Sequence, residues 1–125
     1  MNPEEILERF CIIANISLTD GSPWFLLCEE AGNEITSHLK DSVDVNENSR
    51  RLTVAAASLA FYRYAMYNVA NGSTEYFCAG EIRIKNDLPS TLKTAYEVWL
   101  NAKRAISDLL RDDDFIFERM DKYAN

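Results

Sequence analysis

Few side chains in this sequence can serve as a nucleophile, base or metal ligand, and none stands at a spacing typical of a catalytic motif. His38 is the single histidine, so any Ser-His or Cys-His mechanism would depend on it. No nucleophile lies at a recognisable spacing from it, and neither a Gly-x-Ser-x-Gly turn nor a cysteine-protease signature is present. We therefore interpret His38 as a surface or helix-end residue and predict no catalytic residues and no enzymatic activity.

The cysteines do not form a metal or disulfide pattern. Cys11, Cys28 and Cys78 are odd in number, widely spaced and without a Cys-x-x-Cys pair, which argues against a zinc site and a disulfide framework and favours a reducing compartment. Cys11 and Cys28 lie on apolar helix faces, where a free thiol usually packs as a small hydrophobe. Cys78 would be reactive only if it were exposed beside a cation.

The carboxylates are numerous, but their spacing is not that of a known site. Glu29, Glu30 and Glu34 lack the Glu-x-x-His partner of a carboxylate metal site, so we interpret them as a solvated helix face. The run 112–114 lacks the alternate spacing and central glycine of a calcium loop. With four glycines and no phosphate-binding loop, the sequence predicts no metal and no cofactor.

Length and composition indicate one domain over residues 1–125. Hydrophobic residues make up 47% and charged residues 26%, as in an ordinary packed domain. The net charge of -7 repels phosphate backbones and argues against general nucleic-acid binding. The acidic beginning lacks the features of a signal peptide, and Arg63 interrupts the apolar stretch 52–70, so we expect neither secretion nor a membrane helix.

Periodicity predicts four helices. Asn2 and Pro3 are a typical start for a helix over 3–15, and the turn cluster Thr19–Pro23 precedes a second helix that ends near Lys40. A capping box at 44–47 begins the longest helix, which carries apolar residues on more than one side and extends to Ala70. Ser90 caps a last helix that ends at about Arg111.

A two-residue period between 74 and 85 predicts an extended segment before the last helix. The fold class is therefore mainly α: a four-helix domain with one long central helix and a short β-hairpin or extended segment. This segment and an apolar trio near the end of the sequence are candidates for contacts with other proteins, because unpaired strand edges invite pairing. The candidate contact residues are Tyr76, Phe77, Ile82, Ile84, Phe115 and Phe117. The alternative is that both segments fold onto the chain's own helices.

The order of elements resembles the small head-tail connector (adaptor) proteins of tailed bacteriophages and prophages. The resemblance covers residues 3–120 and is carried by the alanine-rich helix around 55–65 and by Gly80-Glu81-Ile82-Arg83-Ile84, which is similar to the glycine, acidic residue and alternating strand of that family. The sequence departs from the family pattern in two places. Its N-terminal end is slightly longer than the pattern, and its C-terminal tail is short for an arm that inserts into a portal.

The resemblance implies a structural protein in an oligomeric neck ring that joins the portal to the tail. Its partners would be copies of itself, the portal protein and neighbouring neck or tail proteins, with DNA only passing through the lumen and no membrane contact. It would reside in the bacterial cytoplasm during assembly and then in the virion neck. An alternative is a small bacterial interaction or regulatory module that dimerises through its long helix, and an enzyme is the third class.

Overall fold

The structure, a computed structural model, describes the backbone of residues 1–70 and 82–111 and the side chains of 1–70 and 90–111. Its elements in chain order are α1 (Pro3–Ala14), α2 (Leu18–Gly21), the 3-10 helix η1 (Ser22–Trp24), α3 (Phe25–Ser37), α4 (Ser49–Ala70) and α6 (Ile82–Ala105). The fold is mainly helical, as the sequence predicted. The predicted extended segment before residue 82 lies outside the described residues.

Helix α1 begins and ends with the expected capping chemistry. The side chain of Asn2 accepts a hydrogen bond from the backbone N–H of Glu4 at 2.9 Å, and Pro3 occupies the first turn. Asn15 ends the helix in the left-handed conformation, with φ of 59°, and its N–H bonds to the carbonyls of Cys11 and Ile12. The prediction of a helix over 3–15 is confirmed to within one residue.

The stretch expected to be a turn is helical instead. Ser17 accepts a hydrogen bond from the N–H of Asp20 at 3.1 Å and begins α2, and Pro23 lies inside η1. Turn-forming residues also suit short helical turns, because Pro and Ser are favoured in a first turn. The predicted second helix over 23–40 is therefore divided between η1 and α3, and α3 ends before His38.

Two glycines let the first helices approach closely. A Cβ atom at Gly32 of α3 would lie 2.7 Å from Cδ1 of Ile6 in α1. A Cβ at Gly21 would overlap Sγ of Cys11. A larger residue at either position would therefore require the side chain of Ile6 or Cys11 to move.

Helix α4 is the central helix of the fold. Asp44 accepts hydrogen bonds from the N–H groups of Asn46 and Glu47, at 2.9 and 3.2 Å, and so caps a turn that directly precedes α4. The helix itself begins at Ser49, five residues later than the capping box predicted. Buried residues lie on several of its sides, as expected: Leu52, Ala55, Ala56, Ala57, Ser58, Leu59, Ala60, Tyr62 and Ala65.

Helix α6 corrects the prediction for the region before Ser90. The helix begins at Ile82, so residues 82–85 are helical and not extended, and Pro89 lies within the helix instead of at its start. The alternation that predicted an extended segment spans 74–85, and its last four residues fit one helical turn equally well, which explains the error at 82–85. The helix also ends earlier than predicted, at Ala105, and is followed by turns.

A short antiparallel contact joins the ends of α3 and α6. Leu39 and Leu110 form an isolated β-bridge, flanked by hydrogen bonds from Lys40 N–H to the Leu109 carbonyl and from Arg111 N–H to the His38 carbonyl, each 2.9 Å long. We call residues 38–40 and 109–111 the α3–α6 seam. The seam satisfies backbone groups that the two helix ends leave unpaired.

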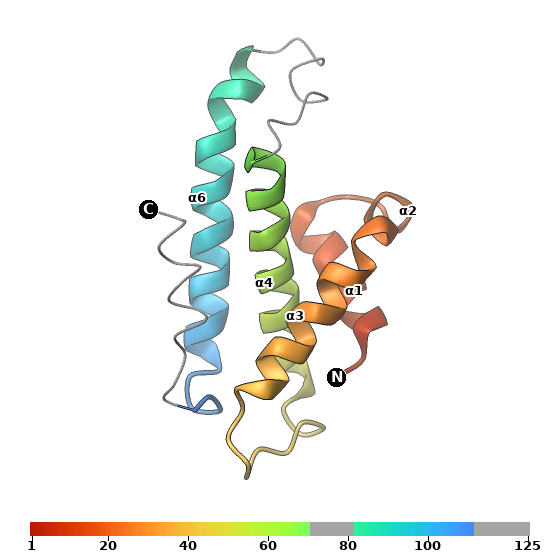
Figure 1. The fold of residues 1–125 in the computed structure, drawn as a ribbon, viewed down its shortest axis with the longest axis vertical. Helices are drawn as coiled ribbons and strands as arrows, with labels where there is room; N and C mark the ends of the chain where they lie inside the picture. Colours follow the sequence, from red (N-terminus) through yellow and green to blue (C-terminus); the bar gives the residue numbers. More distant parts are fainter. Residues whose placement is uncertain (71–81, 112–125) are drawn as a thin grey trace.

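Figure 1 shows how the helices are arranged. Helices α4 and α6 run antiparallel side by side, and α4 also packs against α1 and α3 on its other side. We call residues Pro3–Ser37, with α1, α2, η1 and α3, the N-terminal layer. The hydrophobic core lies around α4, between this layer and α6.

The described helices were also compared with the dimensions of a membrane span. No single one combines the necessary length with the necessary apolar character. The pair Pro3–Ala14 and Leu18–Ser37 passes this test together but is bent by 112°.

Candidate protein-contact surface

The predicted contact residues are only partly within the described structure. Tyr76, Phe77, Phe115 and Phe117 lie outside the described residues, as does Cys78. Ile82 and Ile84 lie in the first turn of α6, which is helical where an extended strand was expected. The expectation that 82–84 offer a strand edge is therefore wrong, because the backbone of these residues is helical and not extended.

Large apolar side chains are exposed elsewhere, mainly on the N-terminal layer. The exposed fraction is 71% for Ile12, 55% for Leu18, 65% for Leu26 and 55% for Tyr67. Three of these four residues belong to α1, α2 and α3, and Tyr67 lies on α4. Exposed apolar side chains that gather on one part of a protein are typical of contact surfaces.

Two hollows lie along the outer side of α1 and meet at Glu8 and Ile12. The first, of about 330 Å³, is lined by charged residues of α1 and by the start of α4: Glu5, Glu8, Arg9, Ile12, Ser49, Arg50 and Thr53. The second, of about 610 Å³, is lined by Glu8, Cys11, Ile12, Asn15, Ile16, Ser17 and Leu18. Ile12 thus stands between a charged and a mainly apolar depression.

An aromatic cluster fixes the position of Tyr67. The Trp24 ring meets Tyr64 and Tyr67 edge to face, with centroids 4.7 and 5.3 Å apart, and Tyr64 meets Phe10 at 5.4 Å. Such edge contacts stabilise by about 0.5 to 1.5 kcal/mol beyond their area burial. The cluster ties η1 to α4 and α1, so the exposed Tyr67 packs against Trp24 on one side.

An ion pair explains the arginine in the apolar central helix. Nη2 of Arg63 donates to Oε1 of Glu34 in α3 at 2.5 Å, and both side chains are about four-fifths buried. The pair keeps both charges compensated where they are shielded from water. Glu34 is therefore an interhelical partner and does not belong to the solvated acidic face that the sequence predicted, whereas Glu30 is exposed as expected.

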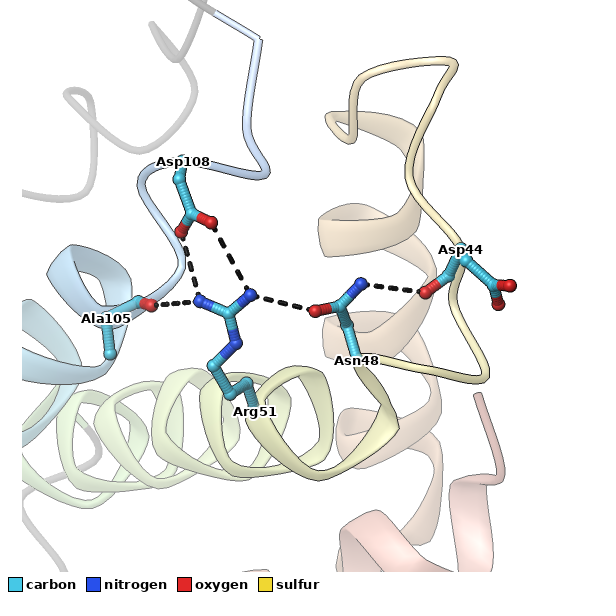
Figure 2. Close-up of polar contacts among 5 residues, drawn as sticks. All are labelled: Asp44, Asn48, Arg51, Ala105 and Asp108. Atoms are coloured by element: carbon cyan, nitrogen blue, oxygen red, sulfur yellow. Dashed lines mark hydrogen bonds and ion pairs between the residues drawn. The ribbon is translucent and has the colours of Figure 1, made fainter.

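Figure 2 shows a second polar network at the start of α4. Arg51 donates through Nη1 to the Ala105 carbonyl at 3.0 Å and to Oδ1 of Asp108 at 3.1 Å, and through Nη2 to Oδ1 of Asn48 at 2.8 Å. Nδ2 of Asn48 in turn donates to the Asp44 carbonyl. The hydrogen bond from Arg51 is the main cause that lowers the pKa of Asp108 below its usual value.

The two thiols of the N-terminal layer are buried and protonated. Burial raises the pKa of Cys11, and burial together with the neighbouring Cys11 raises the pKa of Cys28 to about 12. Both cysteines are free, and a thiol with so high a pKa is a poor nucleophile. Their interpretation as small hydrophobes is confirmed by their burial.

His38 caps the end of α3, but it is not a surface residue. The side chain is buried, and Nδ1 lies 2.9 Å from the Glu34 carbonyl and 3.1 Å from Oγ of Ser37. The helix-end interpretation is confirmed, and the surface interpretation is wrong because the α3–α6 seam covers this position. These contacts give His38 a role in closing α3.

The described part of the chain contains no group of three or more His, Cys, Asp or Glu side chains able to hold a metal ion. What it offers is a set of exposed apolar side chains, for two of which the sequence carried an overlooked signal. Ile12 and Leu26 are large apolar residues that fall outside the apolar stripes of their helices. A large apolar residue on the polar face of an amphipathic helix indicates a contact with another molecule.

Comparison of the chain with family models, with curated proteins and with solved structures found no match. Function is therefore inferred from this surface and from the sequence resemblance.

Proposed function

We propose that this chain is a structural phage or prophage protein that joins the portal to the tail as part of an oligomeric neck ring. The observation that carries the proposal is the exposure of Ile12, Leu18 and Leu26 on a layer whose other side packs against α4. A protein whose work is assembly needs such surfaces, and the sequence resemblance to head-tail connectors supplies the kind of assembly. DNA would only pass through the lumen.

The alternative is a small interaction or regulatory module that dimerises through its long helix. This alternative has less support, because the buried residues of α4 already pack against α1, α3 and α6 of the same chain. An interface on the N-terminal layer needs no such rearrangement. An enzyme has the least support, since the sequence contains no residues at the spacing of a catalytic motif.

The test is assembly of the purified full chain, alone and with a portal ring from a tailed phage or prophage that encodes this chain. We expect sedimentation velocity and electron microscopy to show a ring of this protein docked on the portal. Portal, capsid and tail genes beside its own gene would support the same role. A chain that forms a compact dimer at every concentration and does not bind the portal ring would contradict the proposal.

A further inference from the structure

Charge is distributed unequally over the two sides of the molecule. The N-terminal layer, Pro3–Ser37, contains seven acidic residues and one basic residue. Residues 90–111, which cover the part of α6 whose side chains are described and the turns after it, contain four basic and two acidic residues. Helix α4 lies between the two regions, so an acidic side and a basic side face away from each other (Figure 1).

The acidic side chains of the N-terminal layer remain largely uncompensated. Glu8 on α1 and Glu30 on α3 are exposed, and among the described ion pairs only Glu34 of this layer is engaged, by Arg63. Lys93 and Arg104 are exposed on α6. They stand eleven positions apart, three turns of a helix, and so lie on one face of α6.

We infer that copies of this chain associate head to tail, with the N-terminal layer of one copy against the outer face of α6 of the next. This interface rests on the proposed assembly function and names its two surfaces. Complementary charge steers and orients such contacts. Ile12, Leu18 and Leu26 lie on the acidic side, where the aliphatic stems of Lys and Arg from the next copy can cover them.

A second copy fits these surfaces better than other partners do. A nucleic acid would match the basic face but be repelled by the N-terminal layer, and a basic protein would match only that layer. Another copy of the chain offers both complementary faces. A contact between the N-terminal layer of one copy and α6 of the next joins two different surfaces and is therefore heterologous. Heterologous contacts give a closed ring or an open filament, whereas an isologous contact stops at a dimer.

Charge reversal tests the inference in the full chain. The variant Glu8→Lys/Glu30→Lys makes the acidic side more basic, and Lys93→Glu/Arg104→Glu makes the α6 face acidic. We expect each variant alone to raise the dissociation constant of self-association about tenfold or more in sedimentation velocity, because like charges then meet. An equimolar mixture of the two variants, or one chain with all four changes, should regain association.

A matched control separates the interface from net charge. Asp41→Lys/Glu47→Lys in the α3–α4 connection changes the formal charge by the same amount as Glu8→Lys/Glu30→Lys. If net charge governed association, both variants would associate more strongly, because the wild-type chain carries -7. The inference requires that only Glu8→Lys/Glu30→Lys weakens it. Circular dichroism checks that all variants keep their helices.

The outcomes also separate this inference from the neck-ring proposal. If neither charge reversal changes self-association, the proposed interface is overturned, whereas the neck-ring proposal is not contradicted. Association that follows the reversals in a chain that does not bind a portal ring supports the interface and contradicts the neck ring. A wild-type chain that is monomeric at every concentration, with a portal ring present or absent, overturns the interface.

Discussion

Apolar side chains are buried around α4 but exposed on the outer side of the N-terminal layer. Leu59 of α4 is fully buried among helices of the same chain, whereas Leu26 of α3 is 65% exposed. Alanines at 55, 56, 57 and 60 are likewise buried, so this stretch of α4 is covered by its neighbours. The difference teaches that this domain completes its own core and still carries large apolar side chains at its surface.

The largest expected effect comes from truncating a leucine to alanine in the core around α4 and comparing it with the same truncation on the N-terminal layer. Leu59→Ala should lower the free energy of unfolding by about 2 to 5 kcal/mol, because it leaves a cavity in the core. Leu26→Ala is the matched control and should change it by less than about 0.5 kcal/mol. Urea denaturation followed by circular dichroism measures both. Equal losses would show that Leu26 belongs to the core.

Adding atoms beside α4 should have the next largest effect. Ala57 is fully buried, so Ala57→Leu must displace its neighbours and should cost about 1 to 3 kcal/mol of unfolding free energy. Ala70→Leu on the exposed end of the same helix is the control and should be nearly neutral. A stabilised Ala57→Leu variant would mean that space remains around α4.

The polar network at the edge of α4 should make a smaller, pH-dependent contribution. The pKa of Asp108 is lowered in the folded chain, chiefly by its hydrogen bond from Arg51, so its contribution is present above its usual pKa of 3.8. That contribution is lost as the pH falls through the lowered value. The difference in urea midpoint between wild type and Asp108→Asn should therefore shrink in acid. Arg51→Ala should remove the same pH dependence; if the dependence persists, another group causes it.

The smallest effect on the free energy of unfolding is expected at Ile12, where the effect on self-association should be large. Ile12→Ser should change the unfolding free energy by less than about 0.5 kcal/mol, because this side chain is 71% exposed. It should nevertheless weaken self-association in sedimentation velocity, since it removes apolar surface from the proposed interface. A marked drop in melting temperature would instead place Ile12 in the protomer core.

The parts of the fold that local chemistry determines could be predicted from the sequence. Asn2 and Pro3 begin α1 as expected, and the three-four spacing of apolar residues found the central helix. The errors lie where local signals are ambiguous. The alternation over 74–85 suggested a strand and the turn residues 87–90 a helix start, yet one helix runs through residues 82–90. Packing of α6 along α4 decides this, and no local pattern encodes it.

The candidate surface was harder to predict than the fold. Sequence reasoning searched for apolar residues beyond the helices and selected Tyr76, Phe77, Phe115 and Phe117, which lie outside the described residues and stay predictions. It overlooked Ile12 and Leu26 because each stands close to true core residues in the sequence. Their position outside the apolar stripes of their helices was the available signal, and the packing of those stripes against the rest of the fold shows that both side chains are exposed.

The α3–α6 seam has a consequence for the order of events during synthesis. Arg111 Nη2 donates to the Ser37 carbonyl across 74 positions of the chain, at 2.5 Å. At about 5 to 20 residues per second, a ribosome needs about 4 to 15 s to make that intervening chain. During this interval the end of α3 has no seam to cover it. A nascent chain that stops before Leu109 therefore lacks the carbonyl to which the N–H of Lys40 bonds in the complete fold.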